Sequence, residues 1–133
     1  MWVIDTSALI RLFVPDGPLH PEVETAINRA ASGADLVLAP HLLLAEAASV
    51  LLRKRRRDEL SSQELRALLD EVALLPIRLC EHGPLLPSAC TLAEAHGLSA
   101  YDALYLALAE QHNARLITND KDLAKVAHAL GLA

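Results

Sequence analysis

The sequence is poor in aromatic residues and glycine, and each shortage excludes a class of protein. Aromatic residues make up 3% of the 133 residues, too few for a surface that stacks single-stranded bases. The five glycines form neither a GxGxxG pattern nor a P-loop, which argues against a nucleotide cofactor held by a glycine-rich loop. The six histidines include no HExxH pair, so a zinc hydrolase is not expected.

Long hydrophobic runs and an export signal are also missing. The longest apolar stretch, Leu42–Leu52, contains Glu46 and falls short of the roughly 18 apolar residues that a membrane span needs. The N-terminus lacks a basic region and reaches Asp5 after four residues, unlike a signal peptide. Cys80 and Cys90 lack CxxC spacing and are predicted to be reduced core residues. We therefore expect a cytoplasmic protein.

Positive charge is scarce relative to negative charge. The chain has 12 Lys and Arg against 17 Asp and Glu, for a net charge of −5 and an isoelectric point near 5.6. This argues against a simple basic nucleic-acid binder, whose isoelectric point typically exceeds about 9. The apolar fraction of 53% allows a buried core and excludes intrinsic disorder. The length suits one domain, which we expect to span residues 1–133.

Short apolar runs alternate with helical patterns along the chain. We expect strands at residues 2–5, 35–39, 76–80 and 115–118. We expect helices at residues 8–14, 21–33, 40–57, 61–75, 84–96, 99–113 and 119–129. Thr6 or Ser7 is expected to cap the first helix, and Ser61 with Glu64 forms a capping box for the fourth. Strands separated by helices pair in parallel, so the fold class is an α/β sandwich of three layers.

Four acids stand at unusual positions in this pattern. Ligands of parallel sheets collect outside the carboxyl ends of the strands, and Asp5 ends the first strand while Asp120 follows the last. Glu46 and Asp102 are the only formally charged residues of the apolar stretches 40–52 and 97–109. A carboxylate removed from water costs several kcal/mol unless it is paired, hydrogen-bonded or bound to a metal. No Lys or Arg lies one helical turn from Glu46 or Asp102 to supply that pairing.

Each acid also has a purely structural interpretation. Asp5 and Asp120 can cap the helices that follow them, and Asp102 can form a capping pair with the serine three residues before it. Glu46 belongs to a polar stripe that continues to Arg53 at helical spacing. The convergence of the four acids favours a functional interpretation, because Mg²⁺ and Mn²⁺ bind a few carboxylates plus waters. Such a site can activate water and polarise a phosphoryl oxygen.

Four sequence blocks resemble one known family. They are IDTSALI at residues 4–10, LAE at 44–46, SAYDALYLA at 99–107 and LITNDKDL at 116–123. Together, and in this order, they resemble the PIN-domain ribonucleases, in particular the VapC-type toxins of bacterial and archaeal toxin–antitoxin pairs. The resemblance implies a metal-dependent endoribonuclease for single-stranded RNA with a PIN-like parallel sheet. Four strands are expected, and a fifth is left open because such proteins usually carry a final strand where this chain has only residues 131–133.

The resemblance also implies roles for the acids and for their neighbours. Asp5 and Asp102 correspond to the principal ligands of one or two Mg²⁺ or Mn²⁺ ions. Glu46 and Asp120 would hold a second ion or orient the attacking water, which makes all four acids catalytic. A cognate antitoxin and a homodimer are implied as partners besides the RNA substrate, and the apolar helices at 8–14 and from 42 are candidate surfaces for them. The other residues to which the family assigns or suggests a role are the supporting hydroxyls of Thr6 and Thr118, and Asp122, whose role is open.

Residues 53–57 hold five of the 12 positively charged residues. This basic run is either a solvated helix end or a contact to the RNA backbone. Arg53 and Arg56 continue the polar stripe of Glu46 and are the candidate RNA-binding residues.

Two other functions use the same acids. A phosphohydrolase with Asp5 as nucleophile usually needs a second acid two residues later, where this chain has Ser7. A non-catalytic α/β module, such as a scaffold or phosphoacceptor with an acidic phosphate- or metal-binding pocket, is the alternative that stays open.

Overall fold

The computed structural model describes residues 1–133 and contains one sheet of four short parallel strands in the order β3-β2-β1-β4. The strands are β1 (Trp2–Ile4), β2 (Val37–Pro40), β3 (Arg78–Cys80) and β4 (Arg115–Ile117). Trp2 is in register with Val37 on one side and with Arg115 on the other. The carboxyl ends of β1 and β4 therefore lie next to each other, as the predicted ligand edge requires.

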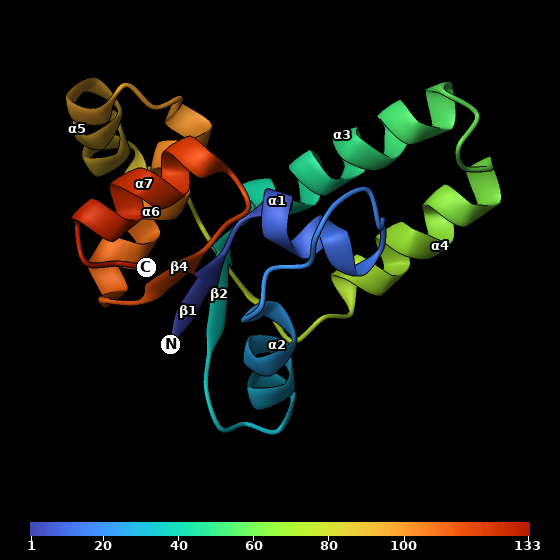
Figure 1. Cartoon of the computed structure of the whole chain (residues 1–133), viewed down its shortest axis with the longest axis horizontal. Helices are drawn as coiled ribbons and strands as arrows, with labels where there is room; N and C mark the ends of the chain where they lie inside the picture. Colours follow the sequence, from blue (N-terminus) through green and yellow to red (C-terminus); the bar gives the residue numbers. More distant parts are fainter.

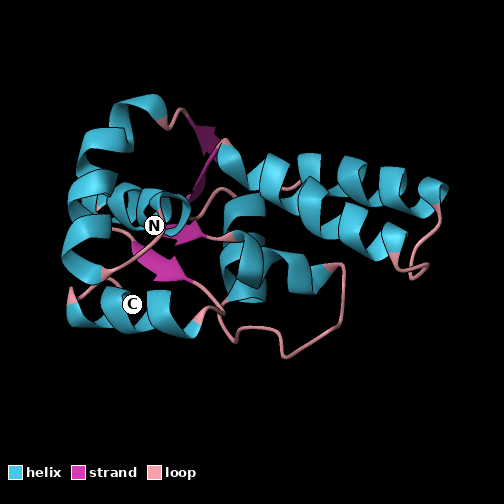
Figure 2. Ribbon diagram, turned by 90° about the horizontal axis from the view of Figure 1, so that it is seen from above, coloured by secondary structure: helices cyan, strands magenta, loops and turns pink.

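Helices cover both faces of this sheet (Figure 1). They are α1 (Thr6–Leu9), η1 (Ile10–Leu12), α2 (Val23–Ala31), α3 (Leu42–Arg56), α4 (Ser62–Ala73), η2 (Gly83–Leu85), α5 (Leu86–His96), α6 (Ala100–His112) and α7 (Lys121–Ala129). Helices α5, α6 and α7 lie on one side, whereas α3 and α4 form a hairpin that projects from the other (Figure 2). The predicted three-layer α/β sandwich is confirmed. None of the helices combines the length and apolar character of a membrane-spanning segment.

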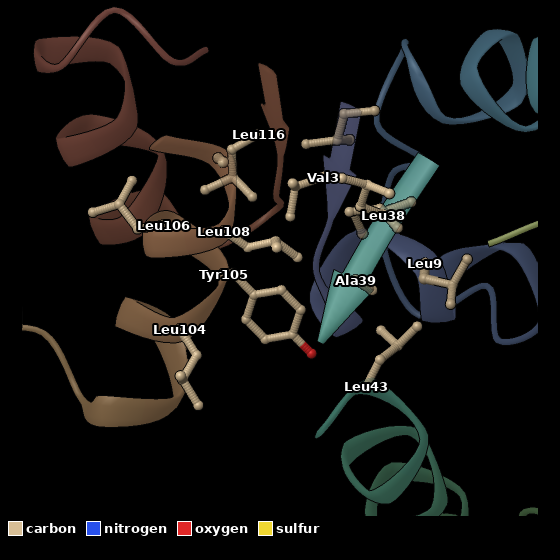
Figure 3. Packing of buried hydrophobic residues seen from close by; sticks show 14 of the residues in the cluster. Val3, Leu9, Leu38, Ala39, Leu43, Leu104, Tyr105, Leu106, Leu108 and Leu116 are labelled. Atoms are coloured by element: carbon tan, nitrogen blue, oxygen red, sulfur yellow. The ribbon is translucent and has the colours of Figure 1, made fainter. Parts of the chain in front are cut away.

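Helix α6 occupies the centre of the packed layers. Its seven consecutive residues Ala103–Ala109 are all buried, and the helix contacts β1, β2 and β4 as well as α5 and α7. A helix that is apolar all round is expected only where other elements surround it. Leu106 and Leu108 point to opposite sides of the helix, Leu108 toward the sheet (Figure 3). The buried run begins directly after Asp102, so this acid marks the point where the core ends.

The first helix begins two residues earlier than the sequence predicted. It starts at Thr6 and is capped by Asp5, whose Oδ1 accepts a hydrogen bond from the backbone N–H of Ala8 at 3.0 Å. The prediction that Thr6 or Ser7 caps the helix is therefore wrong. The physical reason is that Asp5 is the single residue between β1 and α1, so the residue that follows the strand is also the N-cap.

The C-terminus forms no fifth strand. The backbone N–H of Leu116 in β4 donates to the carbonyl oxygen of Leu132 at 2.6 Å, and the Leu132 side chain is buried. Gly131, with φ of 73°, lets the chain turn back after α7. One backbone contact thus covers the edge of β4 where a fifth strand would pair.

Because α6 is central, a cavity made in it should lower the free energy of unfolding strongly. Leu106 has no exposed surface, and Leu106→Ala should lower the free energy of unfolding by about 2–5 kcal/mol, measured by urea denaturation. Leu74→Ala is the control because Leu74 is 84% exposed, and it should change that free energy by less than about 0.5 kcal/mol. Equal losses in the two variants would contradict the central placement of α6.

Candidate active site

The four predicted acids come from four different elements and approach the carboxyl edge of the sheet. Asp5 directly follows β1, and Asp120 lies three residues beyond the end of β4. Glu46 is in the second turn of α3, which follows β2, and Asp102 is in the first turn of α6. The backbone N–H of Asp5 donates to the carbonyl oxygen of Ile117 at 3.1 Å, which fixes the end of β1 against the end of β4.

Asp5 is 4% exposed, and both of its carboxylate oxygens accept hydrogen bonds. Oδ1 accepts from the Ser7 hydroxyl at 2.7 Å and from the N–H of Ala8, and Oδ2 accepts from the Thr118 hydroxyl. Burial raises the pKa of Asp5 from 3.8 to about 6; the three hydrogen bonds oppose the rise, and the charge of Asp102 adds to it. The fold therefore holds this carboxylate in place while making its charged form costly.

The pKa of Asp102 depends on the charges of two other acids of the site. Burial raises the pKa of Asp102 above its ordinary value, and the charges of Asp120 and Glu46 raise it further. None of the six ion pairs in the structure involves any of the four acids. The four acids thus bring negative charge to this edge of the sheet, and no Lys or Arg is paired with any of them.

Asp120 and Asp102, like Asp5, take part in helix capping. Oδ1 of Asp120 accepts from the N–H of Leu123 at 2.9 Å and so caps α7, as the structural interpretation predicted. The N–H of Asp102 donates to the hydroxyl oxygen of Ser99 at 3.1 Å, so Ser99 caps α6. The charge of each still acts on another acid, since Asp120 raises the pKa of Asp102 and Asp102 raises that of Asp5.

Glu46 is held by two hydroxyl groups. Its Oε1 accepts from the Thr6 hydroxyl at 3.0 Å and from the Tyr105 hydroxyl at 2.6 Å. Burial, followed by the hydrogen bond to Glu46, raises the pKa of Tyr105 far above its ordinary value, so the phenol stays protonated. The two predicted supporting hydroxyls therefore serve different acids, Thr6 on Glu46 and Thr118 on Asp5.

A groove of about 660 Å³ extends from Thr6 and Glu46 along α3. Arg11, Arg53 and Arg57 line it, and none of the three forms an ion pair. The place of Arg53 in this groove is compatible with its predicted contact to the RNA backbone, which stays a prediction.

Two neighbouring cations of the basic run differ from Arg53, which lines the groove and forms no ion pair. Arg56, the second candidate RNA-binding residue, is exposed but does not line the groove. Lys54 lines the groove but is engaged by Asp16 and Glu59.

Sequence reasoning missed two residues of this network. The Ser7 hydroxyl donates to Asp5 and accepts from the N–H of Asn119 at 2.9 Å, so it joins the ends of β1 and β4. The spacing of Ser7 two residues after a capping acid could have indicated this role. Tyr105 lies 59 residues from its partner Glu46, and no local pattern indicates that contact.

The donor set fits a hard divalent cation. No three histidine, cysteine or carboxylate side chains are grouped closely enough to hold an ion by themselves. Mg²⁺ typically uses one or two protein carboxylates together with several waters and a substrate phosphate, so it does not need such a cage. The four acids offer only oxygen ligands, and no basic side chain competes for them.

The structure is that of an α/β protein with unpaired acids at the carboxyl edge of its parallel sheet and unpaired arginines in a neighbouring groove, an arrangement that suits the binding of phosphate esters through cations. The comparison with known families narrows that class. Residues 2–129 match the PIN domain, and the chain belongs to the PIN domain family.

Known relatives agree with this assignment along the whole chain. Ribonuclease VapC3 of Pyrobaculum aerophilum is 33% identical over 130 residues, which cover 96% of this chain and 95% of that protein. The crystal structure of VapC20 of Mycobacterium tuberculosis, a Sarcin-Ricin loop cleaving toxin, aligns with a TM-score of 0.68 at 20% identity over 100% of this chain and 97% of that chain. A toxin-antitoxin complex from Klebsiella pneumoniae aligns with a TM-score of 0.55 at 22% identity over 93% of this chain and 91% of that chain. The predicted family, fold and endoribonuclease class are confirmed.

The raised pKa of Asp5 predicts an unusual pH dependence of stability. Because the folded pKa of about 6 lies above the ordinary 3.8, the contribution of Asp5 is full below pH 3.8 and is lost as the pH rises through 6. Asn is uncharged throughout, so Asp5→Asn should be more stable than the parent by up to about 3 kcal/mol at pH 8 in EDTA, and this gain should vanish near pH 4.

Urea denaturation between pH 4 and pH 8 measures this difference. Glu71→Gln, which replaces an exposed carboxylate on α4, is the control and should show no comparable trend. A difference between Asp5→Asn and the parent that stays constant with pH would contradict the assigned burial of charge at Asp5.

Proposed function

We propose that this chain hydrolyses RNA phosphodiester bonds as a Mg²⁺- or Mn²⁺-dependent endoribonuclease, with Asp5, Glu46, Asp102 and Asp120 as its catalytic and metal-binding residues. The observation that carries the proposal is that the charges of these acids, which lie in or beside four different elements, act on one another while none of the acids has a basic partner. Membership in the PIN domain family and the similarity to VapC ribonucleases support it.

The four acids would have different roles in cation binding and catalysis, according to their surroundings. Asp5, whose pKa is raised by burial and by the charge of Asp102, would be one principal cation ligand. Asp102, whose pKa is raised by burial and by the charges of Asp120 and Glu46, would be the other. Glu46 and Asp120 would hold a second cation or orient the attacking water. A bound divalent cation would supply positive charge to the scissile phosphate and increase the acidity of water. Thr118 fixes the position of Asp5 for this role.

The phosphoacceptor and phosphohydrolase alternatives both need Asp5 as a nucleophile. Its carboxylate is 4% exposed, and hydrogen bonds from Ser7, Ala8 and Thr118 occupy both oxygens. An oxygen held in this way is poorly placed to attack a phosphorus atom. The geometry suits a fixed ligand better than a nucleophile, and therefore favours the nuclease.

The groove along α3 is the proposed path of the RNA strand. Thr6 and Glu46 line it at one end, and its unpaired cations, Arg11, Arg53 and Arg57, can contact successive phosphates. Arg56 was a candidate for the same role, but its place outside the groove makes it a weaker one.

We also propose a cognate antitoxin, a homodimer and a cytoplasmic location for this protein. A similar solved structure is a toxin-antitoxin complex, which supports the antitoxin. The hairpin of α3 and α4 carries the exposed Leu52 and is followed by the exposed Leu74, so it offers apolar surface to a partner. An RNA substrate supports the cytoplasmic location.

The proposed metal ligands predict loss of cleavage on removal of either charge. Asp5→Asn and Asp102→Asn should each reduce the rate of RNA cleavage by at least about 100-fold, because each removes several kcal/mol of charge stabilisation. The assay incubates each purified variant with total RNA in MnCl₂, MgCl₂ or EDTA and maps the RNA ends. EDTA should abolish cleavage by the parent.

Glu71→Gln is the matched control, since it removes a carboxylate on α4 outside the pocket, and it should cleave like the parent. Unfolding curves show whether each variant keeps its fold. If Asp5→Asn or Asp102→Asn cleaved RNA at the parental rate, the proposed function of these acids would be wrong.

The groove predicts different effects for two neighbouring arginines. In an Asp5→Asn background, in which cleavage is expected to be lost while the groove is unchanged, Arg53→Ala should weaken RNA binding and reduce the salt slope by about 0.7. Arg56→Ala removes the same charge from the same helix and should have a smaller effect on both. Fluorescence anisotropy with a labelled single-stranded RNA at several salt concentrations measures both quantities. Equal effects would show that the RNA does not follow the groove.

A further inference from the structure

We infer that Tyr105 is a positioning residue that orients Glu46 for cation binding. The inference rests on the proposed function, because it assumes that Glu46 belongs to the cation centre. It is carried by the meeting of three side-chain oxygens from α1, α3 and α6, those of Thr6, Glu46 and Tyr105.

The three oxygens form a closed triangle. The Tyr105 hydroxyl lies 2.6 Å from Oε1 of Glu46, the Thr6 hydroxyl lies 3.0 Å from the same Oε1, and the two hydroxyls lie 3.0 Å apart. The shortest side joins the phenol to the carboxylate, which is the length expected when a hydroxyl donates to a charged acceptor. The other oxygen of Glu46, Oε2, takes part in none of these contacts.

Counting protons assigns the donors. Three contacts share only two hydroxyl protons, because an ionised carboxylate has none to give. A hydrogen bond to a charged acceptor is stronger than one between two neutral hydroxyls, so Tyr105 and Thr6 each donate to Oε1 of Glu46. Their own 3.0 Å approach then follows from sharing one acceptor. Glu46 is thereby held by one oxygen, and its second oxygen is left for a ligand.

Tyr105 is 1% exposed, and its ring packs in the core between α6 and the sheet (Figure 3). The hydroxyl points away from α6 toward the region where β2 ends and α3 begins (Figure 3). A rigid ring anchored in the core therefore fixes the place of its hydroxyl more firmly than a flexible surface side chain could.

Two side chains of the site, Asp102 and Tyr105, come from the same face of α6. Tyr105 lies three residues after Asp102, a spacing that puts both side chains on the same side of the helix. Any displacement of α6 would move a proposed cation ligand and the donor that orients Glu46 together. The buried helix thus couples Asp102 to the carboxylate that comes from α3.

Tyr105→Phe tests this role by removing only the hydroxyl. We expect Mn²⁺ to bind about 10–100-fold more weakly, since loss of a group that orients a metal ligand typically has that effect. The measurements are calorimetric titration of the full chain with MnCl₂ alone, and the rise of the unfolding temperature with MnCl₂. Thr6→Val, which removes the second donor and leaves the ring in place, should also weaken Mn²⁺ binding. Leu106→Val is the control, a core change on α6 that should leave Mn²⁺ binding unchanged.

A double-mutant cycle separates positioning from a general structural role. If Tyr105 acts through Glu46, then Tyr105→Phe should cause no further loss of Mn²⁺ affinity in a Glu46→Gln background. A full additional loss in that background would overturn the inference, and so would parental Mn²⁺ affinity in Tyr105→Phe.

The same set of variants distinguishes this inference from the proposed function. If Asp5→Asn abolishes RNA cleavage but Tyr105→Phe binds Mn²⁺ like the parent, only the role of Tyr105 is wrong. If Asp5→Asn cleaves like the parent, the proposed function itself is wrong, whatever Tyr105→Phe shows.

Discussion

The buried carboxylate of Asp5 is the constraint around which the site is built. It caps α1, accepts from Ser7, and accepts from Thr118 beyond β4, so it joins the first helix to two strands. These hydrogen bonds fix the carboxylate but do not offset its removal from water, because its pKa is still raised to about 6. The ionised carboxylate is therefore only partly stabilised by the fold, and a positive charge at the carboxyl edge of the sheet would stabilise it further.

The first turn of α1 distributes its side chains between two halves of the site. Successive residues of a helix point about 100° apart, so neighbours in sequence face different partners. Ser7 faces Asp5 and the end of β4, whereas Thr6 faces Glu46 and Tyr105. One short helix thus connects the half built from β1 and β4 to the half built from α3 and α6. Either half would lose its geometry if α1 shifted.

Local patterns in the sequence predicted most of the fold and the acids, because capping, alternation and charge in an apolar background are local signals. The contact of Tyr105 with Glu46 could not be found in this way, since it depends on how α6 packs against the sheet. The place of Arg56 outside the groove also follows from a local signal. From Glu46, Arg57 is offset by about 20° around an ideal helix and Arg56 by about 80°, and the structure accordingly has Arg57 in the groove.

The acidic net charge and an RNA substrate are compatible once the charges are placed. Without Asp5, Glu46, Asp102 and Asp120, the net charge of −5 would be −1, so the rest of the surface is nearly balanced. Two divalent cations would bring four positive charges and reverse the sign of the pocket. The free arginines of the groove would then continue a positive path that starts at those cations. Under the proposed function, a phosphate would approach the four acids only after they had bound cations, so cation binding would control access to the site as well as the chemistry in it.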